Sequence, residues 1–173
     1  MDNIILIGMP GAGKSTVGVI LAKTLGMRFI DTDIVLQEQT GRLLQEIIGD
    51  AGTAAFLESE EKMLLSLHCE NTVIATGGSA VFSHGAMEHL AAGGIVIYLK
   101  IPYEEMVRRL RNITTRGIVL FEGQDLREMY DLRVPLYENY AGITIDCSGT
   151  GAETVVERIV RELQKYRQKR SSG

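Results

Sequence analysis

The chain has 173 residues and a net charge of −4 at neutral pH, from 22 acidic and 18 basic side chains. This length suits a single domain with a sizeable core, and the negative balance disfavours a general nucleic-acid binder, which needs a basic face. No apolar stretch has membrane-spanning length, and two cysteines in no metal-like spacing are typical of free thiols in the cytosol. We therefore expect one cytoplasmic, monomeric domain over residues 1–173 that binds neither nucleic acid nor membranes.

The first predicted strand, Ile4–Ile7, leads directly into the sequence GMPGAGKST. Gly8, followed after four residues by Gly13, Lys14 and Ser15, has the spacing of a phosphate-binding loop. Glycines let successive backbone N–H groups approach phosphates, and the helix that follows adds its own unpaired donors. An ordinary strand-to-helix turn is the alternative, and the buried strand and apolar helix face on either side disfavour it. We assign these residues to nucleotide binding: Gly11, Ala12, Gly13, Lys14, Ser15 and Thr16.

Apolar runs and segments with helical periodicity alternate along the rest of the chain. Further strands are predicted at 27–30, 72–75, 95–99 and 143–145, and helices at 14–25, 54–69, 88–92, 102–111, 126–139 and 153–166. Such alternation is typical of parallel strands joined by crossover helices. It predicts a three-layer α/β/α domain with a central, five-stranded parallel sheet.

Two further segments place polar groups at predicted strand ends. FIDTD carries Asp31 and Asp33, and ATGGSA carries Gly77 and Gly78. Open α/β folds bind ligands at the carboxyl ends of their strands, so one carboxylate could belong to a magnesium shell and the other could accept a proton from a hydroxyl. Alternatively, Asp33 simply caps the next helix.

Residues 112–124, NITTRGIVLFEGQ, show no helical period and contain two glycines and Arg116. In a phosphoryl-transfer protein, such a segment is predicted to be a mobile lid that brings an arginine to the phosphates. A plain surface connection remains the alternative.

GMPGAGKST, FIDTD, TGRLLQEII, TGGSAV, the Arg116 loop and LRVPLYENYA occur in the order and spacing of shikimate kinases. The resemblance covers nearly the whole chain. It implies the nucleoside-monophosphate-kinase-like fold and transfer of the γ-phosphate of ATP to the 3-hydroxyl of shikimate.

The resemblance also implies a role for individual residues. Lys14 and Ser15 would serve ATP and Mg²⁺, and Asp31 would order metal-bound water. Asp33 would bind the acceptor hydroxyls and act as the base. Arg109 would stack on the adenine, and Arg116 would contact the transferring phosphate. Gly77 and Gly78 would border the acceptor ring. Arg133 would pair with the acceptor carboxylate. From sequence alone, Arg133 could equally be a helix-surface ion-pair residue near Asp131 and Glu138.

The acceptor side departs from the family pattern in three places. Leu57 stands where a second carboxylate-binding arginine is expected, Ser79 replaces the third glycine of a triplet, and the lid reads RGIVL where Arg-Pro-Leu-Leu is common. Another cation, Arg42 or Arg28, could compensate, or the acceptor could be a different polyol or hydroxy acid. A nucleotide-binding module without turnover is a third possibility, which the joint presence of Asp33, Arg116 and Arg133 disfavours.

Overall fold

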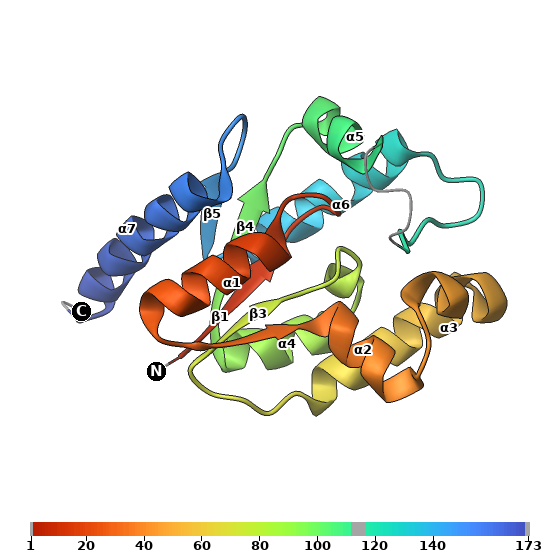
Figure 1. Ribbon diagram of the computed structural model, residues 1–173, viewed down its shortest axis with the longest axis horizontal. Coiled ribbons are helices and arrows are strands. Elements are labelled where there is room, and N and C mark those ends of the chain that lie inside the picture. The colour runs from red at the N-terminus through yellow and green to blue at the C-terminus, as the bar shows by residue number, and fades with distance from the viewer. Residues whose placement is uncertain (1, 112–116, 172–173) are drawn as a thin grey trace.

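The computed structural model describes residues 2–111 and 117–171. Its strands form one all-parallel sheet in the order β2-β3-β1-β4-β5, which confirms the predicted architecture (Figure 1). The strands are β1 (Asn3–Ile7), β2 (Arg28–Asp31), β3 (Thr72–Ala75), β4 (Gly94–Lys100) and β5 (Ile143–Asp146). The central strands β1 and β3 are buried along their whole length, as expected for strands covered on both faces.

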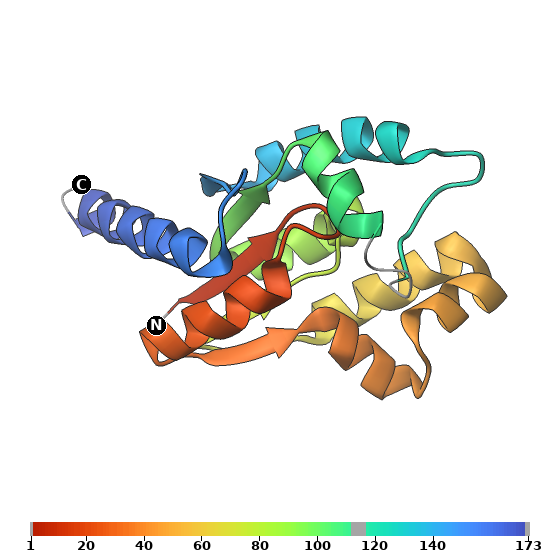
Figure 2. The same ribbon diagram turned by 45° about the horizontal axis from the view of Figure 1, so that its top comes forward.

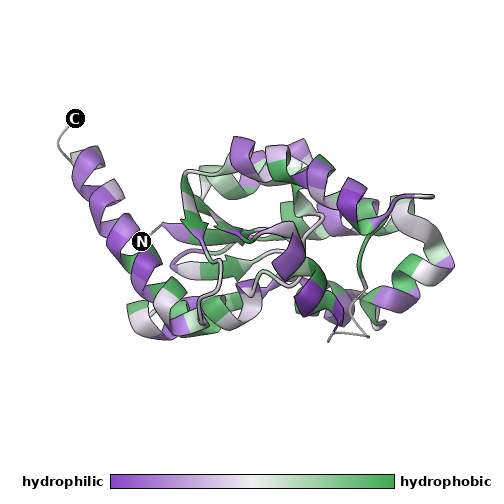
Figure 3. Ribbon diagram, turned by 90° about the horizontal axis from the view of Figure 1, so that it is seen from above, coloured by the Kyte–Doolittle hydropathy of each residue, from purple (hydrophilic) through white to green (hydrophobic). Residues whose placement is uncertain are grey.

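Helices cover both faces of this sheet, with α1 and α7 packed together on one face and α4 and α6 on the other (Figures 1 and 2). The helices are α1 (Lys14–Leu25), α2 (Thr32–Thr40), α3 (Leu44–Ser66), α4 (His84–Ala92), α5 (Tyr103–Arg111), α6 (Leu126–Tyr140) and α7 (Ala152–Ser171), with a short 3₁₀ turn, η1 (Ala80–Phe82). Apolar residues concentrate on the strands and on the inner helix faces (Figure 3). None of the helices described is long and apolar enough to span a bilayer.

The predicted elements were wrong mainly between β2 and β3. The helix expected at 54–69 begins ten residues earlier, at Leu44, and bends at Gly52, whose φ is +82°. Helix α2 was not among the predicted helix ranges, because its sequence TDIVLQEQT buries only Thr32 and Leu36 and shows no continuous apolar face of helical period. Of the two cysteines, Cys147 is buried and Cys69 is half-buried, and both are free thiols.

The carboxyl ends of β1, β2 and β3 all lie at one edge of the sheet because the strands are parallel. The phosphate-binding loop follows β1, Asp31 ends β2, and the ATGGSA segment follows β3. The topology therefore brings together three motifs that are spread over residues 8–80 of the sequence.

Candidate active site

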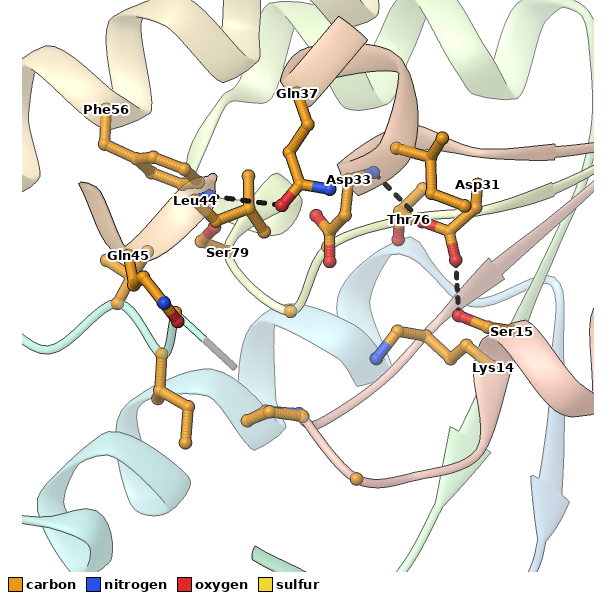
Figure 4. A pocket seen from close by; sticks show the side chains of 18 of the residues that line it. Lys14, Ser15, Asp31, Asp33, Gln37, Leu44, Gln45, Phe56, Thr76 and Ser79 are labelled. Carbon is orange, nitrogen blue, oxygen red and sulfur yellow. Dashed lines mark hydrogen bonds between the residues drawn. The ribbon is translucent and has the colours of Figure 1, made fainter. Parts of the chain in front are cut away.

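Ten of the predicted site residues line one pocket of about 660 Å³ at this edge of the sheet. They are Gly11, Gly13, Lys14, Ser15, Asp31, Asp33, Gly77, Gly78, Ser79 and Arg133. Ala12 is buried and Thr16 is exposed, and neither belongs to the lining. Figure 4 shows Lys14 and Asp33 directed into this cavity from opposite sides.

The loop between β1 and α1 is shaped by its glycines. Gly8 has a φ of +148°, and a Cβ there would lie 2.6 Å from the carbonyl oxygen of Leu99, so no larger residue fits. The ammonium group of Lys14 is held inside the loop, where Nζ donates to the carbonyl oxygens of Gly8 (2.7 Å) and Met9 (2.8 Å). Backbone donors and one buried cation thus surround a space suited to phosphate groups.

The side chains of Ser15 and Asp31 are hydrogen-bonded to each other at the start of α1, the helix that follows the loop. The Ser15 hydroxyl donates to Oδ2 of Asp31 at 2.5 Å, while Oδ1 of Asp31 accepts from the backbone N–H of Asp33 at 3.0 Å (Figure 4). The residue that caps α2 is therefore Asp31, and the prediction that Asp33 serves only as a cap is wrong. A hydroxyl and a carboxylate side by side are the hard oxygen ligands that Mg²⁺ prefers.

Arg109, predicted to stack on the adenine, lies beside the loop. Its Nη1 donates to the carbonyl oxygen of Gly11 at 3.0 Å, and its Nη2 forms an ion pair with the buried carboxylate of Glu105. These contacts hold the guanidinium against the phosphate-binding loop, and Arg109 does not belong to the described lining of the main pocket.

On the acceptor side, Arg133 is almost completely enclosed, with 1% of its surface exposed. Its Nη2 donates to the carbonyl oxygen of Val119, and its buried Nε has no hydrogen-bond partner in the described part of the chain. The two carboxylates near it in sequence pair with other cations: Asp131 with Arg127 and Glu138 with Lys100. The alternative that Arg133 is a surface ion-pair residue is therefore wrong.

Within the ranges 2–111 and 117–171, no carboxylate forms an ion pair with Arg133. Its charge does attract the buried Glu60 carboxylate, but no described carboxylate pairs with the guanidinium directly. A buried cation is stabilised by direct contact with an anion, so the position is suited to an anionic ligand group.

The described part of the predicted lid lies over the acceptor side. Residues 117–119 line the pocket, and the Thr53 hydroxyl donates to the carbonyl oxygen of Leu120 at 3.0 Å. Gly117 packs closely on α3, where a Cβ would lie 2.9 Å from the backbone nitrogen of Gln45. Arg116 lies outside the described residues.

Leu57 is half-buried and lines a smaller neighbouring cavity of about 240 Å³ instead of the main pocket. Neither suggested replacement cation lies in the described lining of the main pocket: Arg42 pairs with Asp50, and Arg28 is exposed at the start of β2, at the opposite edge of the sheet. Among the described lining residues of the main pocket, the cations are Lys14 and Arg133.

Glu60 was not predicted as a site residue; its carboxylate is 3% exposed and accepts a hydrogen bond from the Ser79 hydroxyl at 2.7 Å. Burial raises its pKa to about 7; repulsion from Asp33 acts in the same direction, and the Ser79 hydrogen bond, Arg133 and Lys14 act against it. A sequence signal existed, because Glu60 lies four residues from Phe56 and four from Leu64, on the inward face of α3.

Comparison with known proteins agrees with this arrangement. A family model described as shikimate kinase matches residues 10–164. The chain is 41% identical over 164 residues to the shikimate kinase of Mycobacterium avium, covering 92% of both chains. It is 36% identical over 168 residues to that of Thermodesulfovibrio yellowstonii, covering 95% of this chain and 96% of the relative.

A solved structure of shikimate kinase from Acinetobacter baumannii in complex with shikimate superposes with a TM-score of 0.87 at 33% identity. The match covers 96% of this chain and 94% of that one. Together, the matched family model, the similarity over almost full length and the shared fold show that this chain belongs to the shikimate kinase family.

Proposed function

We propose that this protein transfers the γ-phosphate of ATP to a ring hydroxyl of shikimate, acting as a cytoplasmic monomer. Family membership supports a small-molecule kinase over a binding module without turnover. The observation that carries the choice of acceptor is Arg133, a buried guanidinium in the pocket wall whose Nε has no hydrogen-bond partner among the described residues. Shikimate would supply a carboxylate that pairs with this guanidinium directly.

In this proposal the nucleotide side holds ATP and Mg²⁺. The loop amides and the Lys14 ammonium bind the phosphates, and the Ser15 hydroxyl and Asp31 carboxylate hold the metal ion or its waters. Bound Mg²⁺ neutralises charge on the phosphate oxygens. Lys14 would exchange its two loop carbonyls for phosphate oxygens.

Asp33 would activate the attacking hydroxyl, and the lid would bring Arg116 to the transferring phosphate. The Asp33 carboxylate enters the pocket opposite Lys14, so it can orient the attacking hydroxyl and accept its proton (Figure 4). Arg116, directly before the segment that lines the acceptor side, would contact the transferring phosphate when the lid closes.

A coupled ADP-release assay with shikimate tests the proposal, and Arg133→Met tests its acceptor side. Loss of one charge-assisted contact, about 1.5 to 3 kcal/mol, should raise the KM for shikimate about 10- to 150-fold and leave the KM for ATP unchanged. Arg127→Met is the matched control, because Arg127 is an exposed arginine on the same helix, paired with Asp131. An unchanged KM for shikimate in folded Arg133→Met would refute carboxylate binding at this position.

The absence of arginine at position 57 favours a second candidate, a related kinase with a less anionic acceptor, and Leu57→Arg separates the two. With shikimate as the natural acceptor, the added guanidinium should lower its KM about tenfold with little change in kcat, because the carboxylate contact is remote from the reacting hydroxyl. Initial rates at varied shikimate concentration measure both constants. A KM that does not fall, in a variant with an unchanged circular dichroism spectrum, would favour the other acceptor class.

A further inference from the structure

Glu105 is a buried carboxylate to which the proposed reaction gives no role. It lies on α5 with 9% of its surface exposed, outside the described lining of the main pocket. Its Oε1 pairs with Nη2 of Arg109, and its Oε2 accepts from the backbone N–H of Gly149 at 3.1 Å. Both carboxylate oxygens are therefore used, and they join α5 to the loop between β5 and α7.

Arg109 extends this connection to the phosphate-binding loop, which lies beside α5 (Figure 2). Its guanidinium bridges Glu105 and the carbonyl oxygen of Gly11, to which Nη1 donates at 3.0 Å. A Cβ at Gly11 would lie 3.5 Å from Cβ of Arg109, and one at Gly13 would lie 3.9 Å from its Nη1. The side chain therefore runs along the loop from one glycine to the other. Because the donors of a guanidinium form a rigid planar fork, pairing one nitrogen with the carboxylate orients the other towards the loop.

The peptide group between Gly11 and Ala12 is held at both of its polar atoms. Its carbonyl oxygen accepts from Arg109, and its N–H, on Ala12, donates to the carbonyl oxygen of Met9 at 3.0 Å. The same Met9 oxygen accepts from Nζ of Lys14 at 2.8 Å. Because a peptide group is planar, fixing its carbonyl also fixes its N–H. A chain of contacts thus runs from the α5 carboxylate through the loop backbone to the Lys14 ammonium.

The loop needs such support because two of its residues are glycines in the left-handed region. Gly11 has a φ of +80° and Gly13 a φ of +90°. Glycine reaches this region readily, but it reaches many other backbone conformations as well. Contacts from outside the loop must therefore select the conformation that binds phosphates, and the hydrogen bond from Arg109 is one of them.

We propose that Glu105 is a positioning residue for phosphoryl transfer, which orients Arg109 so that the phosphate-binding loop is preorganised before ATP binds. The inference rests on the proposed function, since the loop must bind the phosphates of ATP. It adds a role at the loop backbone to the predicted adenine contact of Arg109. A preorganised loop loses less conformational freedom on binding, so this role should appear as higher affinity for the phosphates.

Calorimetric titration of the whole protein with Mg²⁺-ATP and with inorganic tripolyphosphate tests this role, because tripolyphosphate carries phosphates without a base. Glu105→Gln keeps the shape of the side chain and removes its charge. It should weaken the binding of both ligands by a similar factor, about 10- to 100-fold. In the ADP-release assay, the KM for ATP should rise by the same factor while the KM for shikimate keeps its wild-type value. A general loss of structure would change both constants.

Glu104→Gln is the matched control. Glu104 is the preceding residue of α5 and is exposed, so this variant should bind both ligands as the wild type does. Arg109→Lys keeps a cation beside the buried carboxylate but removes the fork, and it should weaken tripolyphosphate binding as Glu105→Gln does.

A double variant tests whether the carboxylate acts through Arg109. The affinity of Glu105→Gln/Arg109→Met for tripolyphosphate should lie within about twofold of that of Arg109→Met alone, whereas independent effects would multiply. The predicted adenine contact of Arg109 does not enter this comparison, because the ligand has no base.

The outcomes separate this inference from the proposed function. Wild-type affinity for tripolyphosphate in folded Glu105→Gln or Arg109→Lys overturns the positioning role and leaves the proposed function standing. Multiplied effects in the double variant also overturn it, because the carboxylate then acts by another route. Binding of ATP without binding of tripolyphosphate by the wild type contradicts a loop preorganised for phosphates and overturns it as well. If the wild type binds neither ligand and releases no ADP, the proposed function fails and this inference fails with it.

Discussion

Replacing Lys14 by alanine is expected to lower kcat about a thousandfold or more in the ADP-release assay. The ammonium group is the buried cation of the phosphate-binding loop. A positive charge at this place mainly stabilises the negative charge on the phosphate oxygens in the transition state. The same group donates to the carbonyl oxygens of Gly8 and Met9, so the variant should also lose some thermal stability.

Two further variants separate the loss of turnover from the loss of thermal stability. Lys14→Met keeps most of the aliphatic packing and should be as inactive as Lys14→Ala while unfolding nearer the wild-type temperature. Lys23→Met removes an exposed lysine from the same helix and should leave turnover unchanged. Substantial turnover in folded Lys14→Met would contradict the assignment of this loop to phosphoryl transfer.

Glu60 should make the stability of the protein depend on pH in a way that Glu60→Gln abolishes. Burial raises the pKa of the Glu60 carboxyl from its ordinary value of 4.5 to about 7 in the folded protein, which therefore binds a proton that the unfolded chain has already released. This contribution to stability is fully present below pH 4.5 and is lost as the pH rises through 7. The shift corresponds to about 3 kcal/mol in the free energy of unfolding.

Urea unfolding at several values between pH 4.5 and 8 measures this dependence. Over that range, the wild type should lose about 3 kcal/mol of stability relative to Glu60→Gln. The control is Glu61→Gln, at the next residue of α3, whose carboxylate accepts from the Ser83 hydroxyl; this variant should follow the wild type. Parallel curves for wild type and Glu60→Gln would show that the Glu60 carboxyl is not held in the buried, proton-binding state.

Much of the nucleotide side could be predicted from the sequence because its determinants are local. The strand, the glycine loop and the helix follow one another within residues 3–25, and the loop conformation depends on glycines that the sequence shows directly. The sheet was predictable as well, since buried parallel strands are apolar runs separated by helices. Helix α2 was missed because its start depends on one side-chain cap, Asp31, and not on an apolar face.

The acceptor side was decided by contacts between distant parts of the chain. Arg133 lies on a helix with charged neighbours, and only its packing beneath Val119, with its guanidinium over the Phe82 ring, shows that it is buried. Glu60 likewise acquires its environment from Ser79, nineteen residues away, and from Asp33.

By itself, the sequence therefore determined the fold class and the phosphate-binding loop. Both depend on local features, because the spacing of apolar residues decides between strand and helix, and glycines allow the backbone conformations of the loop. The burial and charge environment of Arg133, Glu60 and Leu57 were decided only by the tertiary structure. The physical reason is that desolvation and electrostatic interaction depend on which atoms from other elements surround a group, and sequence spacing does not specify that.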